Sequence, residues 1–160
     1  MSRIFVSGSA TGLGLMAGEL LASQGHQVVL HARNGNRAED ARRALPQAEA
    51  VVVGDIETIA GAKDVAAQVN SLGHFGAVIH NAAVGYREGH RVTSDGLPHV
   101  FAINTLSAYI LTAPDQQVSL TDPASARRPS CRRTLSTRDA ARGSGSAAAH
   151  RRAWAPRSGR

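Results

Sequence analysis

The stretch "VSGSATGLGL", residues 6–15, decides the fold, because it places three glycines between an apolar run and the start of an apolar helical pattern. The run "IFVS" (4–7) is short and apolar, which suits a buried strand. The segment "GLMAGELLASQG" (14–25) has leucines near helical spacing and closes on a glycine. A glycine-rich turn from a strand into a helix predicts the opening unit of an α/β protein.

Short apolar runs typical of strands and segments with helical spacing continue to alternate beyond this unit. We expect further strands at 27–32, 50–55 and 77–82, and further helices at 36–45, 57–73 and 94–112, the last capped by Ser94 or Asp95. Nearly all-apolar strands separated by helices indicate parallel βαβ units with right-handed crossovers. The predicted fold class is α/β, a partial Rossmann-like doubly wound parallel sheet with strand order 3-2-1-4 and a switch point beside the first strand.

The pattern stops near Ala113, where the composition changes. Ten of the 18 basic residues, all arginine, lie in 114–160, with only three acids, so the net charge of +6 belongs to this tail. We divide the chain into a truncated dinucleotide-binding domain (1–113) and an Arg/Ala/Ser-rich tail (114–160) expected to be largely disordered. Our hypothesis for the tail is a shifted reading frame, and the alternative is a genuine arginine-rich extension.

The glycine loop has the features of a phosphate site. One glycine permits the tight turn, and the others let the backbone approach a pyrophosphate and let the helix pack on the sheet. Free N–H groups at the helix start face the anion, and hydroxyl side chains add donors. The candidate cofactor-binding residues of the loop are Gly8, Ser9, Thr11, Gly12, Leu13 and Gly14. The alternative is an ordinary glycine-rich connection.

The end of the second strand favours NADP over NAD. An NAD site usually has a carboxylate there to hold the ribose hydroxyls. The sequence instead reads "LHARNGN", with no acid and with Arg33 where a 2′-phosphate could be met. The planar, multi-donor guanidinium suits a phosphate. The alternative is a solvated loop arginine.

These features resemble the short-chain dehydrogenase/reductase family over residues 3 to about 113. "SGSATGLG" is similar to the cofactor loop of that family, and "GDIE" resembles its adenine-contacting step. "HNAAV" (80–84) resembles its N-N-A-G segment, and "FAINTLSAYILT" resembles its fourth helix. The resemblance implies cofactor contacts at Asp55, Ile56, Asn81, Ala82 and Ala83, and a catalytic role, with a helix kink, at Asn104. Asp55 and Asn81 could also be ordinary turn residues.

The proton-transfer machinery of the family is missing. The resemblance implies a Tyr-x-x-x-Lys pair and a serine, but both tyrosines, Tyr86 and Tyr109, precede the break and the only lysine is Lys63. Whether this chain is an enzyme is therefore left open. We expect a fragment of an NADP-dependent oxidoreductase that acts on alcohols and carbonyls. The fragment keeps the cofactor-binding part and has no turnover. The alternatives are a polyanion- or nucleic-acid-binding module, and a non-catalytic dinucleotide-binding protein.

The remaining expectations concern partners and location. The sequence has no spaced His/Cys/Asp set, so we expect no metal site. We expect a dinucleotide as small-molecule partner and association between copies through 94–112, but no nucleic-acid partner. No apolar run is long enough for a spanning helix, and Cys131 is the single cysteine, so we expect a cytoplasmic protein without a membrane anchor.

Overall fold

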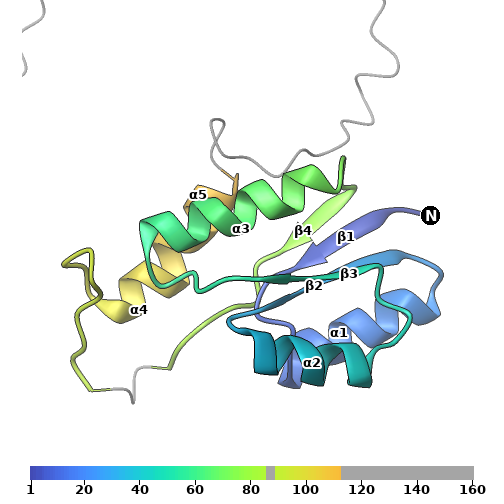
Figure 1. Cartoon of the computed structure of the whole chain (residues 1–160), viewed down its shortest axis with the longest axis horizontal. Coiled ribbons are helices and arrows are strands. Elements are labelled where there is room, and N and C mark those ends of the chain that lie inside the picture. Colours follow the sequence, from blue (N-terminus) through green and yellow to red (C-terminus); the bar gives the residue numbers. More distant parts are fainter. Residues whose placement is uncertain (86–88, 113–160) are drawn as a thin grey trace, which may run out of the picture. The chain divides into compact units, whose positions relative to one another are not determined.

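The computed structural model describes residues 1–85 and 89–112 (Figure 1). In this part four strands form one parallel sheet: β1 (Arg3–Val6), β2 (Gln27–Ala32), β3 (Ala50–Val53) and β4 (Ala77–Ile79). The order β3-β2-β1-β4 confirms the predicted arrangement. The expectations for 114–160 fall outside the described residues, so they stay predictions.

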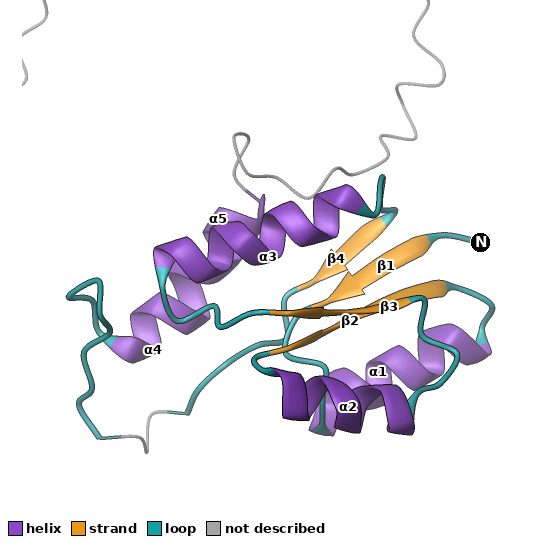
Figure 2. Cartoon of the chain, viewed as in Figure 1, coloured by secondary structure: helices purple, strands orange, loops and turns teal. Residues whose placement is uncertain are grey.

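Helices cover both faces of the sheet (Figure 2). On one face lie α1 (Gly12–Ser23) and α2 (Gly35–Ala44), and on the other lie α3 (Ile59–Ser71) and α5 (Ser107–Thr112). Successive strand residues point to opposite faces. In β1, Phe5 therefore joins the core under α3 and α5, whereas Ile4 and Val6 join the core under α1 and α2. Burial on both faces explains the nearly unbroken apolar strands.

The predicted helix over 94–112 begins later than expected. It starts with α4 (His99–Phe101), continues through the π-helical turn η1 (Ala102–Leu106) and ends as α5. The expected cap, Asp95, serves another helix, because its Oδ2 accepts a hydrogen bond from the Ile59 backbone N–H at 2.7 Å, where α3 begins. Gly96, at φ 76°, closes a turn ahead of α4 instead.

Candidate functional site

A cleft of about 440 Å³ lies at the carboxyl ends of the strands, beside the glycine loop. Its walls come from the segments that follow β1, β2, β3 and β4. Eight predicted cofactor residues line it: Gly8, Thr11, Arg33, Asp55, Ile56, Asn81, Ala82 and Ala83. The other four, Ser9, Gly12, Leu13 and Gly14, belong to the same loop without lining the cleft. The topology therefore gathers residues as distant in the chain as Gly8 and Ile103 at a single edge of the sheet.

Two of the loop glycines are required by close packing. A Cβ atom on Gly8 would lie 2.7 Å from the Ala82 Cα, and Gly8 has a φ of 62°. A Cβ atom on Gly14 would lie 2.4 Å from the Asn81 Nδ2 and 2.6 Å from the Gly8 carbonyl oxygen. The start of α1 therefore packs directly on the loop that follows β4, which leaves no space for a side chain.

Gly12 differs, because a Cβ atom there would meet nothing within 4 Å. It stands at the first position of α1 with a φ of 62°. The preceding residue, Thr11, is the N-cap of α1, yet its hydroxyl makes no capping hydrogen bond, and the first turn carries no acidic side chain. The start of α1 thus has no side-chain cap and has open space beside Gly12, and an uncapped helix N-terminus is a position at which an anion can bind.

The Ser9 hydroxyl has internal partners instead. It donates to the Val6 carbonyl oxygen at 2.7 Å and accepts from the His31 backbone N–H at 2.8 Å, and the residue is fully buried. Ser9 therefore links β1 to β2, and its hydroxyl does not face the cleft in this structure.

Asn81 and Ser7 fasten the loop after β4 to the glycine loop. The Asn81 Nδ2 donates to the carbonyl oxygens of Ser7 (3.2 Å) and Gly8 (2.9 Å). The Ser7 hydroxyl accepts from the backbone N–H groups of Asn81 and Ala82, both at 3.1 Å. Asn81 thus shapes the cleft wall through its amide.

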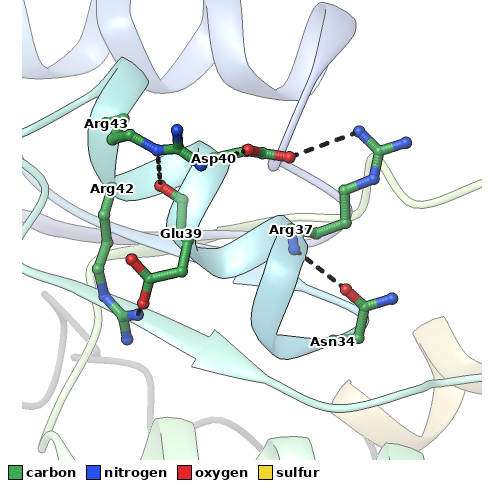
Figure 3. Close-up of polar contacts among 6 residues, drawn as sticks. All are labelled: Asn34, Arg37, Glu39, Asp40, Arg42 and Arg43. Atoms are coloured by element: carbon green, nitrogen blue, oxygen red, sulfur yellow. Dashed lines mark hydrogen bonds and ion pairs between the residues drawn. The ribbon is translucent and has the colours of Figure 1, made fainter.

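Three arginines line the cleft, Arg33, Arg37 and Arg91, and of these Arg91 is paired with Glu57. Within 1–85 and 89–112, no hydrogen bond or ion pair occupies Arg33. Figure 3 shows Arg37 in the first turn of α2, with Asp40 between it and Arg43. Asp40 is 2.9 Å from Arg43 but 3.9 Å from Arg37, so Arg37 is only weakly held. Sequence reasoning missed Arg37. Recognising Asn34 as the N-cap of α2 would have placed Arg37 in the first turn of that helix, close in the chain to Arg33.

Asp55 and Ile56 follow β3. The Asp55 Oδ1 accepts from the Glu57 backbone N–H at 3.0 Å, as a turn residue does, while the side chain remains exposed at the cleft. Ile56 is 5% exposed and belongs mainly to the core under α3. At the far wall, three residues that sequence reasoning did not select form a cluster: Glu57 pairs with Arg91 and lies 3.4 Å from the His99 Nε2.

Asn104 lies inside η1, and its amide holds the segment after β4. The Oδ1 accepts from the Val84 backbone N–H at 2.9 Å, and the Nδ2 donates to the Val84 carbonyl oxygen at 3.0 Å. A π-helical turn surrounds Asn104, and such turns are frequent at functional sites. Its predicted catalytic role remains a prediction.

The family model for short chain dehydrogenases matches residues 2–115. The chain belongs to this family. Over 114 residues it is 51% identical to an uncharacterized oxidoreductase of Emericella nidulans, covering 70% of this chain and 45% of that protein. It is 39% identical over 113 residues to a short-chain dehydrogenase of Gibberella zeae, covering 71% and 43%. The chain thus spans slightly less than half the length of the curated short-chain dehydrogenases and oxidoreductases that it matches.

Solved structures share the same architecture. An L-sorbose reductase from Gluconobacter frateurii, complexed with NADPH and L-sorbose, superposes with a TM-score of 0.57 at 26% identity over 67% of this chain and 43% of that one. A short-chain dehydrogenase from Sphingobium yanoikuyae in complex with NADPH gives a TM-score of 0.55 at 22% identity, covering 67% and 44%. The latter likeness concerns the fold alone.

Among the described residues, no helix has the length and apolar character needed to cross a membrane. The same part of the chain contains no group of three His, Cys, Asp or Glu side chains arranged to hold a metal ion.

Proposed function

We propose that this chain binds NADP(H) in the cleft at the carboxyl ends of β1, β2, β3 and β4. The observation that carries the proposal is that an open, uncapped start of α1 and two arginines, Arg33 and Arg37, belong to the same cleft. A dinucleotide phosphate needs both, because its pyrophosphate suits the helix start and its 2′-phosphate suits guanidinium groups. The NADPH complex of the similar L-sorbose reductase supports this choice.

The residues have distinct parts in the proposal. The Thr11 hydroxyl and the N–H groups of Gly12 and Leu13 would hold the pyrophosphate. Arg33 and Arg37 would hold the 2′-phosphate, and no carboxylate stands at the end of β2 to repel it. Asp55 and Ile56 would bound the adenine end, with the segment from Asn81 to Ala83 forming the floor. When bound, the nicotinamide group would supply the hydride chemistry of the family.

We further propose that this chain binds the cofactor without turnover. Neither tyrosine is followed four positions later by a lysine, and Lys63 precedes both. The chain therefore lacks the pair that would move a proton to or from a substrate oxygen. A reductase assay with NADPH and a panel of ketones tests this, and reduction at an ordinary enzymic rate would overturn it. The described residues favour no second function.

The cofactor preference is tested by measuring the dissociation constants of NADPH and NADH by fluorescence. Arg33→Ala and Arg37→Ala should each weaken NADPH binding about tenfold, because each removes a charge-assisted hydrogen bond to phosphate. NADH binding should barely change, since NADH has no 2′-phosphate. Arg42→Ala is the matched control, because Arg42 lies on the same helix and pairs with Glu39 outside the cleft. Equal losses for both coenzymes would contradict the assignment.

A further inference from the structure

His31, the penultimate residue of β2, has a buried imidazole beneath the glycine loop. The residue is 2% exposed, yet it lines the floor of the cleft. Its Nδ1 lies 2.9 Å from the Gly8 backbone nitrogen, and its Nε2 lies 2.9 Å from the Gly54 carbonyl oxygen. The ring therefore connects the segment after β1 with the segment after β3.

The two partners determine the protonation state of the ring. The Gly8 N–H can only donate, so the Nδ1 must accept and carry no proton. The Gly54 carbonyl oxygen can only accept, so the Nε2 must carry the proton. These requirements select the neutral Nε2–H tautomer. A doubly protonated ring would place an N–H group against the N–H group of Gly8.

The surroundings favour the same neutral form. Burial lowers the pKa of His31, and this effect outweighs the Gly54 hydrogen bond and the Asp55 charge, both of which act to raise the pKa. Phe5 of β1 packs edge-on against the ring, with centroids 6.3 Å apart. Other charged or titratable groups lining the cleft around the ring are Arg33, Arg37, Glu57, Arg91 and His99.

The backbone of Gly8 is held through both its N–H group and its carbonyl oxygen. Its N–H donates to His31, and its carbonyl oxygen accepts from the Asn81 Nδ2. Gly8 also has a left-handed φ of 62° and approaches Ala82 closely. Since the start of α1 packs on the Gly8 carbonyl through Gly14, a shift of Gly8 would also move the start of α1, next to Thr11 in the cleft lining.

We propose that His31 is a positioning residue of the dinucleotide site, which holds the first glycine of the phosphate loop in its binding geometry only while the imidazole is uncharged. This proposal rests on the proposed NADP(H) binding. His31 does not contact the cofactor in it. Its neutral ring places Gly8, and Gly8 places the start of α1.

Two substitutions separate the two hydrogen bonds of the ring. An asparagine amide reaches roughly the position of the Nδ1, so His31→Asn keeps an acceptor for Gly8 and cannot be protonated near neutral pH. A glutamine amide reaches roughly the position of the Nε2, so His31→Gln keeps the donor to Gly54 and loses the acceptor for Gly8. Both variants remove the ring, so a purely packing role predicts similar effects for the two.

The first experiment uses the cofactor-free, full-length protein. Nitrogen-15 NMR of the wild type should identify the Nε2–H tautomer of His31. The Gly8 amide should exchange slowly with solvent in the wild type and in His31→Asn, and faster in His31→Gln. An Nδ1–H tautomer, or a Gly8 amide that exchanges equally fast in all three proteins, would overturn the proposal whether or not a dinucleotide binds.

The second experiment measures NADP⁺ affinity calorimetrically between about pH 5 and pH 8, the interval in which histidines change charge. The 2′-phosphate also takes up a proton at about pH 6. His31→Asn keeps this titration and lacks only that of His31, so its pH profile is the reference for the wild type. Relative to this variant, the wild type should lose affinity at acid pH. His31→Gln should bind about three- to tenfold more weakly at every pH.

The outcomes distinguish the two proposals. Parallel pH profiles for the wild type and His31→Asn, or equal affinities for His31→Asn and His31→Gln, would overturn the role of His31. Failure of the wild type to bind NADP⁺ at any pH, with a protected Gly8 amide, would overturn the proposed function and with it the cofactor-positioning role, leaving only the link from His31 to Gly8.

Discussion

Gly8, Gly12 and Gly14 share one loop but differ in what lies beside each α-carbon. Gly8 and Gly14 touch the segment after β4, whereas Gly12 faces open space. The sequence motif treats the three alike. The structure assigns two of them to packing and leaves the third at the place where an anion could approach.

Substitutions at Gly14 and Gly12 should both lower stability, but only the one at Gly12 should directly weaken cofactor binding. Gly14→Ala should lower the free energy of unfolding by about 1–3 kcal/mol, because the new methyl group collides with Asn81 and Gly8. Gly12→Ala should cost only about 1–2 kcal/mol, from the left-handed backbone alone. It should nevertheless weaken NADPH binding severalfold, because the new methyl group would occupy the open space beside the helix start, where the pyrophosphate is proposed to bind. Urea unfolding and fluorescence titration measure the two effects. Weakened binding by Gly14→Ala with full stability would contradict this division.

The pH dependence of folding follows from the lowered pKa of His31. As pH falls below the ordinary histidine value of about 6.5, the unfolded chain takes up the proton first. The stabilising effect of neutral His31 is therefore complete above that pH and is lost as pH falls through the lower folded-state pKa. Urea unfolding at a series of pH values should show a steeper acid loss for the wild type than for His31→Asn. Superimposable slopes would exclude this linkage.

At the scale of the element, the start of α3 is completed by one local and one distant side chain. The hydroxyl of its own N-cap, Thr58, accepts from the Gly61 N–H at 3.0 Å, and the Asp95 carboxylate accepts from the Ile59 N–H. Asp95 thereby ties the segment before α4 to α3, which lies 36 residues earlier in the chain.

Removing either cap should have a similar cost. Thr58→Ala and Asp95→Ala should each lower the free energy of unfolding by about 1 kcal/mol, because each leaves one N–H group of α3 without its partner. Asp95→Ala should in addition speed amide exchange at Thr93 and Gly96, whose turn it anchors. Glu19→Ala, on the exposed side of α1, is the control. Denaturant unfolding measures the cost, and no loss in Asp95→Ala would show that the bond is dispensable.

At the scale of the molecule, β4 is one of the two edge strands of the sheet in the described part of the chain. The α4–α5 segment exposes two aromatic side chains, Phe101 at 45% and Tyr109 at 65%. Large apolar side chains exposed together often mark an interaction site.

These features support the proposed association between copies through this segment. Tyr109→Glu should shift the protein toward the monomer in sedimentation velocity, because a carboxylate opposes burial at a contact between subunits. Leu20→Glu is the control, since Leu20 is similarly exposed but lies on α1, on the other face of the sheet. An unchanged mass distribution for Tyr109→Glu, or an equal shift for both variants, would argue against α4–α5.

The parts predictable from the sequence are those set by local pattern. Apolar strands, helical spacing and the glycine turn each depend on neighbouring residues, so the strand order followed from them, whereas the family was indicated by the resemblance of its motifs. The predicted start of the helix near Asp95 was wrong. The sequence shows that Asp95 can cap a helix, but it does not show which helix the side chain caps. Arg37 was missed for a related reason, since its place in the cleft depends on how α2 leaves the sheet.

By itself, the sequence determined a parallel sheet that opens with a phosphate-type loop, because the period and direction of a βαβ unit are local properties of the chain. Only the tertiary structure decided which polar groups serve the fold and which remain open to a ligand. His31, Ser9 and Asn81 turn inward to partners more than 20 residues away, while Thr11 and Arg33 face the cleft. Such pairings form only when the crossovers bring distant segments together.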